Sequence, residues 1–571
     1  TVTKEKENAI SIVTGNLTYE LLIDGEEGNT LTVPSNTVKD FTITLSNPNN
    51  RTARFNFYYV GALSSNTKVG YIVEDGTNTL PDEKGINLEK EGTVGSSNTY
   101  IIRVINNSGS SVTVNLGVSV GLDYNDLSLP DNGHLFEEIT YKGEVGTVVL
   151  SNISKDNIYD DGVDTFTTGQ YPNNYVWYSG KLWRAVSVNN EEKTVKLVTQ
   201  WNISTISYDN DSSAFAGSYM EEWLNDTTVD GFLGNLRNYE DFIATDAVWD
   251  ATMDNRDLGS ITRPSGETTV TAPVGLLNIY EYQSSNNGKT DGYLNNSLVW
   301  WLLTSYDTSS HICATHADGN VNYGTVSDAY GVRPSINLKS NVKIVDGDGT
   351  VDNPYRLNGD NDTNLSGTLL STRYSGEYIR FGNDENNLYR IVSHENGTGT
   401  KIVSAEPLKS SGTFIESTFG SNTTFSSTNT IGSFLNGDYL TNYVDSTYSD
   451  MIEDSTMWYL GTVGDGESYK LAKYTDTSMS GYTTTTEAKV GLQRLGELMT
   501  GQFDMNSNCS NFWTLTPYSL SNVRRITYYG RSYDYSSTFV NGIKPSLNLK
   551  SNVQITSGTG TKNDPFELKL A

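Results

Sequence analysis

The sequence predicts a multidomain protein in which an N-terminal all-β sandwich is followed by two copies of one α+β domain. Three observations lead to this prediction. The chain has 571 residues, and at roughly 100–200 residues per domain this length corresponds to about three to five domains. A long segment that begins at Gly331 returns at Gly542. The first 122 residues instead contain no Trp and alternate apolar with polar residues.

The sandwich is predicted for residues 1–122. Apolar residues take every second position in four runs, namely Leu17 to Leu21, Phe41 to Leu45, Phe55 to Tyr59 and Val112 to Val120. Turn-forming segments such as Asn47-Pro-Asn-Asn50 separate these runs. Short strands at this spacing are typical of a β-sandwich. Residues 123–142 have little periodicity and include Leu129-Pro-Asp-Asn-Gly133, so they are predicted to be a linker.

The two copies are predicted to span residues 143–358 and 359–571. Gly331-Val-Arg-Pro-Ser-Ile-Asn-Leu-Lys-Ser-Asn-Val-Lys-Ile344 returns as Gly542-Ile-Lys-Pro-Ser-Leu-Asn-Leu-Lys-Ser-Asn-Val-Gln-Ile555, a shift of 542 − 331 = 211 residues. Leu182-Trp-Arg184 and Leu388-Tyr-Arg390 extend the match upstream. This period is too long for a solenoid repeat and indicates tandem globular domains.

Each copy is expected to begin with strands and to continue with helical segments. Alternating patterns predict strands at residues 175–178 and 183–186. Helices are predicted at residues 219–224 and, from the spacing of Val490, Leu492, Leu495 and Leu498, at residues 487–499. Trp183, Trp301 and Trp513 lie within apolar alternation and are expected in the core, the alternative being a surface on which sugars stack.

The repeat resembles an uncharacterised bacterial domain family that is similar to the C-type-lectin and formylglycine-generating-enzyme folds. The order Trp301-Leu-x-Thr304, a Gly-rich hairpin and Gly331-Val-Arg-Pro334 carries the resemblance, and Trp513, Thr516 and Gly542 to Pro545 match it in the second copy. This resemblance implies two α+β, C-type-lectin-like domains. A formylglycine-generating activity is not expected, because Cys313 and Cys509, one in each copy, do not occupy equivalent positions.

The N-terminal domain is similar to the camelysin and TasA group of secreted fibre proteins. A polar N-terminal arm, the strand-like Val13 to Tyr19 and the segment Val38 to Asn47 carry this similarity. It implies a jelly-roll-like sandwich whose arm adds a strand to the next subunit. The arm residues expected to take part are Val2, Ala9, Ile10, Ile12 and Val13.

Charge narrows the classes of partner. With 39 Lys plus Arg and 68 Asp plus Glu, the chain carries a formal net charge of −29. Such a charge disfavours nucleic acid and anionic membranes. No apolar run approaches the ~20 residues needed to span a bilayer. The chain begins at Thr1, which agrees with a secreted protein whose leader has been removed, although a chain cut there would begin in the same way.

The candidate metal and catalytic motifs are weak. His311-Ile-Cys-Ala-Thr-His316 offers soft ligands but fits no common zinc spacing, and Asp346, Asp348 and Asp352 resemble a calcium loop whose acids are absent from the second copy. A Gly-supported hairpin and an exposed loop are the preferred interpretations. The adjacent acids Asp160 and Asp161, and Glu221 and Glu222, are interpreted as solvated surface rather than glycosidase acids. No cofactor, metal or catalytic residue is therefore predicted, and the states of Cys313 and Cys509 are left open.

The preferred hypothesis is a structural subunit of a bacterial extracellular filament or surface layer. It would assemble with copies of itself through the sandwich and display the two lectin-like domains. The alternative is a surface adhesin that does not polymerise and binds glycans or surface proteins through the segments 305–328 and 517–539, which are rich in Tyr, Ser, Asn and Arg. A secreted hydrolase is a weaker third hypothesis.

Overall fold

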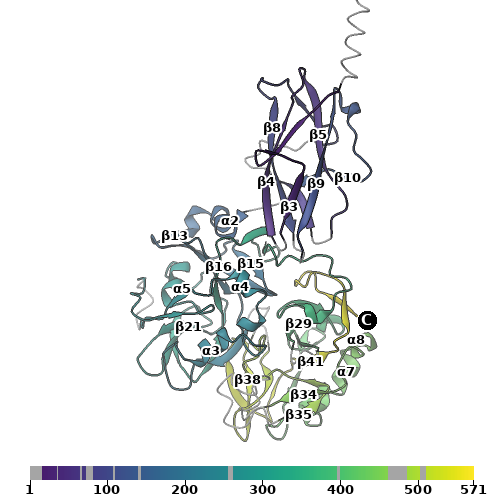
Figure 1. Cartoon of the computed structure of the whole chain (residues 1–571). Helices are drawn as coiled ribbons and strands as arrows, with labels where there is room; N and C mark the ends of the chain where they lie inside the picture. The colour runs from purple at the N-terminus through teal and green to yellow at the C-terminus, as the bar shows by residue number, and fades with distance from the viewer. Residues whose placement is uncertain are drawn as a thin grey trace, which may run out of the picture. The chain divides into compact units, whose positions relative to one another are not determined.

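The computed structural model shows a mostly β-sheet, multidomain chain in which helices are few and short (Figure 1). It describes residues 16–34, 37–64, 67–72, 82–106, 110–138, 143–254, 262–394, 399–460, 485–501 and 510–571. The arm residues Val2, Ala9, Ile10, Ile12 and Val13, together with Cys509, lie outside the described residues. None of the described helices is long and apolar enough to cross a membrane.

The chain divides into two compact units. The first unit consists of Thr1–Gly143, Lys343–Asp346 and Leu357–Asn364, and the second unit of Glu144–Val342, Gly347–Arg356 and Leu365–Ala571. Both copies of the repeat therefore contribute most of their residues to one compact unit.

Two sheets and one shared apolar core form the first unit. One sheet has the order β11-β6-β8-β4-β1-β2 and the other the order β10-β5-β9-β3, with β7 also paired to β5. The bounds are β1 Glu20–Ile23, β2 Glu26–Glu27, β3 Thr30–Val33, β4 Thr37–Ser46, β5 Ala53–Val60, β6 Thr67–Ile72, β7 Ile86–Leu88, β8 Ser97–Asn106, β9 Val112–Gly121, β10 Gly133–His134 and β11 Glu137–Glu138. Phe41, Ile43, Phe55 and Phe57, which the alternation places on one face of each strand, are buried in this shared core.

The segment expected to be a linker contributes to this unit. Within residues 123–142, β10 pairs with β5 and β11 pairs with β6. Phe136, which lies between these two strands, is buried and packs against Phe57 with ring centroids 5.2 Å apart. A single buried aromatic residue and two-residue strands produce no periodicity that a sequence pattern could reveal.

The two repeats have the same strand pairing. In the first repeat β17 lies between β16 and β25, and in the second β30 lies between β29 and β41. Each repeat also has a second sheet, ordered β18-β24-β21-β22-β23 in the first and β33-β40-β37-β38-β39 in the second. The bounds in the first repeat are β16 Lys181–Asn189, β17 Val195–Thr199, β18 Ser204–Ser207, β21 Trp300–Ser305, β22 His311–Thr315, β23 Val321–Thr325, β24 Ala329–Val332 and β25 Ser335–Leu338. Those in the second are β29 Leu388–Ser393, β30 Thr400–Ser404, β33 Glu416–Thr418, β37 Phe512–Pro517, β38 Asn522–Ile526, β39 Ser532–Ser536, β40 Val540–Gly542 and β41 Ser546–Leu549.

Irregularities in the strands recur at equivalent positions. The register between β16 and β17 shifts at Ser187, and that between β29 and β30 shifts at Ser393. The cation of the Gly-Val-Arg-Pro segment is buried in both repeats. Arg333 lies 4.4 Å from the ring centroid of Trp300, and Lys544 lies 5.1 Å from that of Phe512. Both donate hydrogen bonds to backbone carbonyls, Arg333 Nε to Thr199 at 2.8 Å and Lys544 Nζ to Met499 at 3.1 Å.

The predicted helix at residues 219–224 is confirmed as α3, Tyr219–Asn225, which Ser218 caps by accepting a hydrogen bond from the Glu221 N–H. The predicted helix at residues 487–499 is wrong. This segment contains the end of β35, Thr485–Ala488, then β36, Val490–Gly491, and a series of turns. Its apolar residues are buried as expected, but Gly496 and Met499 have φ values of 87° and 68°, which a right-handed helix excludes.

Candidate ligand pocket in the first repeat

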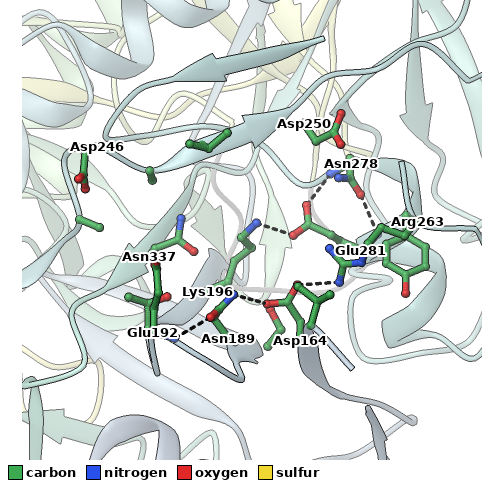
Figure 2. Close-up of a pocket in the computed structure, with 17 residues that line it drawn as sticks. Asp164, Asn189, Glu192, Lys196, Asp246, Asp250, Arg263, Asn278, Glu281 and Asn337 are labelled. Atoms are coloured by element: carbon green, nitrogen blue, oxygen red, sulfur yellow. Dashed lines mark hydrogen bonds and ion pairs between the residues drawn. The ribbon is translucent and has the colours of Figure 1, made fainter. Parts of the chain in front are cut away.

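A polar pocket of about 340 Å³ opens on the first repeat (Figure 2). Its walls come from β14, Asp164–Thr167, from β16, β17 and β25, from the segment that leads into β19, Val248–Asp250, and from the first turn of α5, Ile279–Ser285. The residues that line it are Val163, Asp164, Ser187, Asn189, Glu192, Thr194, Lys196, Ala244, Asp246, Ala247, Val248, Asp250, Arg263, Asn278, Tyr280, Glu281 and Asn337.

An ion pair beside a Trp ring forms one wall. Lys196 Nζ donates to Glu281 Oε2 at 2.5 Å and lies 4.8 Å from the ring centroid of Trp249. Glu281 is fixed by a capping box at the start of α5, in which Glu281 accepts from the Asn278 N–H and Asn278 accepts from the Glu281 N–H. Asn and Glu three residues apart at the start of a helix explain why this carboxylate points into the pocket.

The second repeat contains the same three side chains. Lys401 Nζ donates to Glu497 Oε1 at 2.5 Å and lies 5.0 Å from the ring centroid of Trp458. The Glu497 carboxylate accepts from the Arg494 N–H three residues earlier, as the carboxylate of Glu281 does from Asn278. Lys401 and Glu497 are buried, with side chains 2% and 6% exposed, whereas those of Lys196 and Glu281 are 17% and 9% exposed. We call each set of three the Lys-Glu-Trp cluster.

Contacts from the first repeat surround the second cluster. Trp223 Nε1 donates to the Gly496 carbonyl at 3.0 Å, and Ser204 Oγ donates to the Glu497 carbonyl at 2.9 Å. Asp230 lies 3.5 Å from the Arg494 guanidinium. The segment of the second repeat that corresponds to the start of α5 is thus engaged by the first repeat, while α5 itself lines an open pocket.

A second charged cluster forms the edge of the pocket. Asp161 accepts hydrogen bonds from Tyr280 Oη at 2.6 Å, from Arg263 Nε at 2.8 Å and from the N–H groups of Val163 and Asp164. Arg263 also pairs with Asp164 at 2.7 Å. Burial would raise the pKa of Asp161, but these hydrogen bonds outweigh it and lower the pKa to about 2. Burial and the bond to Asp161 raise the pKa of Tyr280, which therefore stays a neutral donor.

The pocket carries an excess of negative charge. Five acids line it, and two cations, Lys196 and Arg263, leave a formal charge of 2 − 5 = −3. Both cations already have carboxylate partners. Within the described ranges the carboxylates of Glu192 and Asp246 have no hydrogen bond or ion pair, and Asp250 accepts only through Oδ1, from Thr252. Ser187 is 5% exposed, and its hydroxyl also has no partner among the residues that the structure describes.

Neither metal motif forms a metal site in the described part of the chain, where no three His, Cys, Asp or Glu side chains are placed to hold an ion. Asp348 instead accepts from the N–H and hydroxyl of Thr350, and His311 pairs with Asp307. Cys313 is buried, and its Sγ donates to the Asp254 carbonyl at 3.4 Å. The Gly-supported hairpin is present in both repeats. A Cβ on Gly347 would lie 2.0 Å from the Pro354 carbonyl oxygen, and one on Gly558 would lie 2.1 Å from that of Pro565.

Of the other predictions from the sequence, the one for the three Trp residues is confirmed and the one for Asp161 is wrong. Trp183, Trp301 and Trp513 are core residues, as predicted. The interpretation of Asp161 as solvated surface is wrong, because its side chain is only 7% exposed and binds Arg263. The segments 305–328 and 517–539 consist largely of the hairpins β22–β23 and β38–β39, in which Tyr323, Tyr528 and Phe539 are exposed.

Sequence reasoning missed the pocket and the Lys-Glu-Trp clusters. The Lys residues correspond at a shift of 401 − 196 = 205, the Trp residues at 458 − 249 = 209 and the Glu residues at 497 − 281 = 216. No single shift aligns the three, so only the strand around each Lys was recognisable. The capping pattern Asn278-x-x-Glu281 was the available signal for one of them.

A family model described as a domain of unknown function, DUF6273, matches residues 262–340. This segment includes α5 and β21 to β25, and it contains Arg263, Asn278, Tyr280, Glu281 and Asn337 from the pocket wall. No curated protein and no solved structure matches the chain.

Proposed function

We propose that the chain is an extracellular, surface-displayed binding protein whose first repeat binds a polar ligand, such as a glycan, in the pocket. The observation that carries the proposal is the difference between the two Lys-Glu-Trp clusters. One lines an open pocket, while the other is enclosed by contacts between the repeats. A retained framework with one open copy suggests that the first repeat binds and the second repeat supports it.

The lining of the pocket supports binding of a hydrogen-bonding ligand. Asn189, Asn278 and Asn337 offer both donors and acceptors, and Ser187 and Thr194 add hydroxyl groups. Its volume lies near the lower end of the roughly 300–1,000 Å³ of small-molecule sites. We further propose that each repeat is C-type-lectin-like and that the first unit is a jelly-roll-like sandwich.

A glycan array probed with the full chain tests this proposal. Thr194, at the pocket wall and half-buried, is replaced by Trp to fill the pocket, and exposed Tyr528 on the other candidate surface is replaced by Ala. We expect signals that are lost in Thr194→Trp and retained in Tyr528→Ala. A blank array for the unsubstituted chain, or signals that only Tyr528→Ala removes, would contradict binding of a glycan in the pocket.

The second candidate is a structural subunit of a filament or surface layer. It is favoured by the half-paired edge of β4. Among the described strands, β1 pairs with β4 only from Ile43 to Ser46, because the chain then crosses to β3 in the other sheet. The stretch Thr37–Phe41 pairs with β8 on one side alone. Such an edge can accept a strand from another copy.

Negative-stain microscopy of the full chain, compared with a chain that lacks residues 1–14, tests the second candidate. Filaments that form only from the full chain would support assembly by strand addition. A matched variant, Val38→Pro, would remove an N–H donor from the unpaired side of β4, because Val38 lies four residues before Thr42, whose backbone groups face the β1 side. Particles that stay monomeric at high protein concentration would count against the filament.

A further inference from the structure

We propose that the pocket of the first repeat selects an amino sugar, a hydroxyl-rich ring with a protonated primary amine. This inference rests on the proposed function and narrows it to a ligand class. It starts from the charge of the pocket, which contains five carboxylates and two cations. Because Lys196 is paired with Glu281, and Arg263 with Asp161 and Asp164, neither cation is available to neutralise an anionic ligand.

The acids that remain are placed as acceptors. Within the described ranges the carboxylates of Glu192 and Asp246, two exposed residues, have no hydrogen bond or ion pair, and Asp250 Oδ2 has none either. Hydrogen bonds between an ammonium group and a carboxylate are about twice as strong as those between neutral groups. A protonated amine that entered this pocket would therefore gain more than a hydroxyl group in the same place.

The uncharged groups indicate a ring with hydroxyls rather than an amine alone. Ser187, which is almost fully buried, has a hydroxyl without a partner in the described part of the chain, and Asn337 lines the same pocket. Figure 2 shows Asp246 and Asn337 on one side of the Lys196–Glu281 ion pair, and Asp250 and Asn278 on the other side. A lysine side chain offers a single ammonium group and would leave the Ser187 hydroxyl and the amides to water, whereas ring hydroxyls could bond to them.

The residues of the second repeat at the aligned positions support an amine-binding role for the acids of the first repeat. Alignment on Trp249 and Trp458 places Ser455 where the first repeat has Asp246, and Tyr459 where it has Asp250. The position of Asn278 is taken by Arg494, which pairs with Asp230 of the first repeat. Both repeats therefore contain the Lys-Glu-Trp cluster. Only the first repeat, whose cluster lines the pocket, has acids at the positions of Asp246 and Asp250.

Ligand-observed NMR titration of the full chain tests the inference with four probes, which are glucosamine, glucose, N-acetylglucosamine and Nα-acetyl-lysine amide. We expect glucosamine to bind at least about tenfold more tightly than glucose or N-acetylglucosamine, as one charge-assisted hydrogen bond predicts. Affinity should fall as pH rises through the pKa of the sugar amine, and it should fall with added salt.

The variant Glu192→Gln/Asp246→Asn/Asp250→Asn should lose the preference for glucosamine. Its control, Glu416→Gln/Asp438→Asn/Glu487→Gln, removes the same charge from exposed positions of the second repeat and should keep it. Equal affinity for glucosamine and glucose, or a preference that survives in the pocket variant, overturns the inference. Tighter binding of the lysine probe overturns it in favour of a peptide. If the chain binds neutral glycans on the array, and Thr194→Trp abolishes this binding, the proposed function stands. The same result without a preference for glucosamine excludes an amino sugar as the ligand.

Discussion

Lys401 donates a hydrogen bond to Glu497 across 2.5 Å, and both side chains are buried against Trp458 between strands of the second repeat. Lys196 and Glu281 make the same contact in the first repeat at the edge of a pocket. Burial alone would raise the pKa of the Glu497 carboxyl, but the neighbouring cations Lys401 and Arg494 outweigh burial and hold this pKa below its usual value. The same ion pair is therefore enclosed in the second repeat and lines a pocket in the first repeat.

Removal of the buried cation should be costly. Lys401→Met leaves the Glu497 carboxylate without its main partner, and we expect the second unit to lose about 3–5 kcal/mol of unfolding free energy. Lys196→Met should cost less, because water reaches Glu281 through the pocket. Urea unfolding of both variants measures the difference. The double variant Lys401→Met/Glu497→Gln should recover part of the loss, and equal losses in the two single variants would contradict the assignment.

The contact between repeats depends on a glycine turn. Ser179 and Gly180 form the two-residue turn before β16, with φ values of 53° and 72°, and the Gly180 carbonyl accepts from Arg390 Nη2 of the second repeat at 3.1 Å. A Cβ on Gly180 would lie 2.4 Å from the Ser375 carbonyl oxygen. Gly180→Ala should therefore lower the melting temperature of the second unit and loosen the repeats.

Gly217 provides the matched control for this substitution. Its φ is 77°, but a Cβ there would meet nothing within 4 Å. Gly217→Ala thus measures only the cost of a positive φ, about 1 kcal/mol. If Gly180→Ala and Gly217→Ala lowered the melting temperature equally, close packing at Gly180 would be disproved.

Asp161 should make stability depend on pH at the acid end. Its folded-state pKa of about 2 lies below the ordinary value of 3.8, so the folded state binds the proton more weakly than the unfolded state. The resulting stability, about 2 kcal/mol, is present above pH 3.8 and is lost as pH falls toward 2. Asp161→Asn should be less stable than the unsubstituted chain at pH 7, and the gap should shrink at pH 3. Asp160→Asn, at an exposed neighbour, should cost less at pH 7. A gap that does not depend on pH would contradict the prediction.

His394 should also lower the stability of the folded state as pH falls, but at a higher pH than Asp161 does. Burial lowers its pKa below 6.5, while Nε2 donates to the Arg373 carbonyl at 2.5 Å and Thr400 Oγ1 lies 3.2 Å from Nδ1. Because the unfolded state takes up the proton first, stability should fall as pH drops below about 6.5. His394→Asn should weaken this dependence between pH 7.5 and 5.5, and His316, whose pKa burial also lowers, should account for part of what remains.

The strands could be predicted because they follow from patterns among residues that are close together in the sequence. Alternation placed Phe41, Phe55 and Phe57 in one core, and identity at a shift of 211 identified β25 and β41 as equivalent strands. The helix predicted at residues 487–499 failed because the spacing of buried residues alone cannot separate a helix from a series of tight turns. The positive φ of Gly496 excludes a right-handed helix, and its carbonyl accepts a hydrogen bond from Trp223 Nε1.

The pocket could not be predicted because its parts are brought together only by folding. Lys196 and Glu281 are 85 residues apart, and Arg263 and Asp161 are 102 residues apart. Each alone is an ordinary charged residue in an acidic chain. The adjacent acids Asp160 and Asp161 suggest a solvated pair, but in the structure Asp160 accepts from the Gly162 N–H and Asp161 accepts from Tyr280 Oη.

Binding in the first repeat can be tested most directly by hydrogen–deuterium exchange of the full chain, with and without the glycan that gives the strongest array signal. The account predicts slower exchange at residues 187–196, 244–250 and 278–281, and unchanged exchange at the equivalent segments around Lys401, Trp458 and Glu497. Protection confined to the hairpin β38–β39, or to the second repeat, would contradict the account.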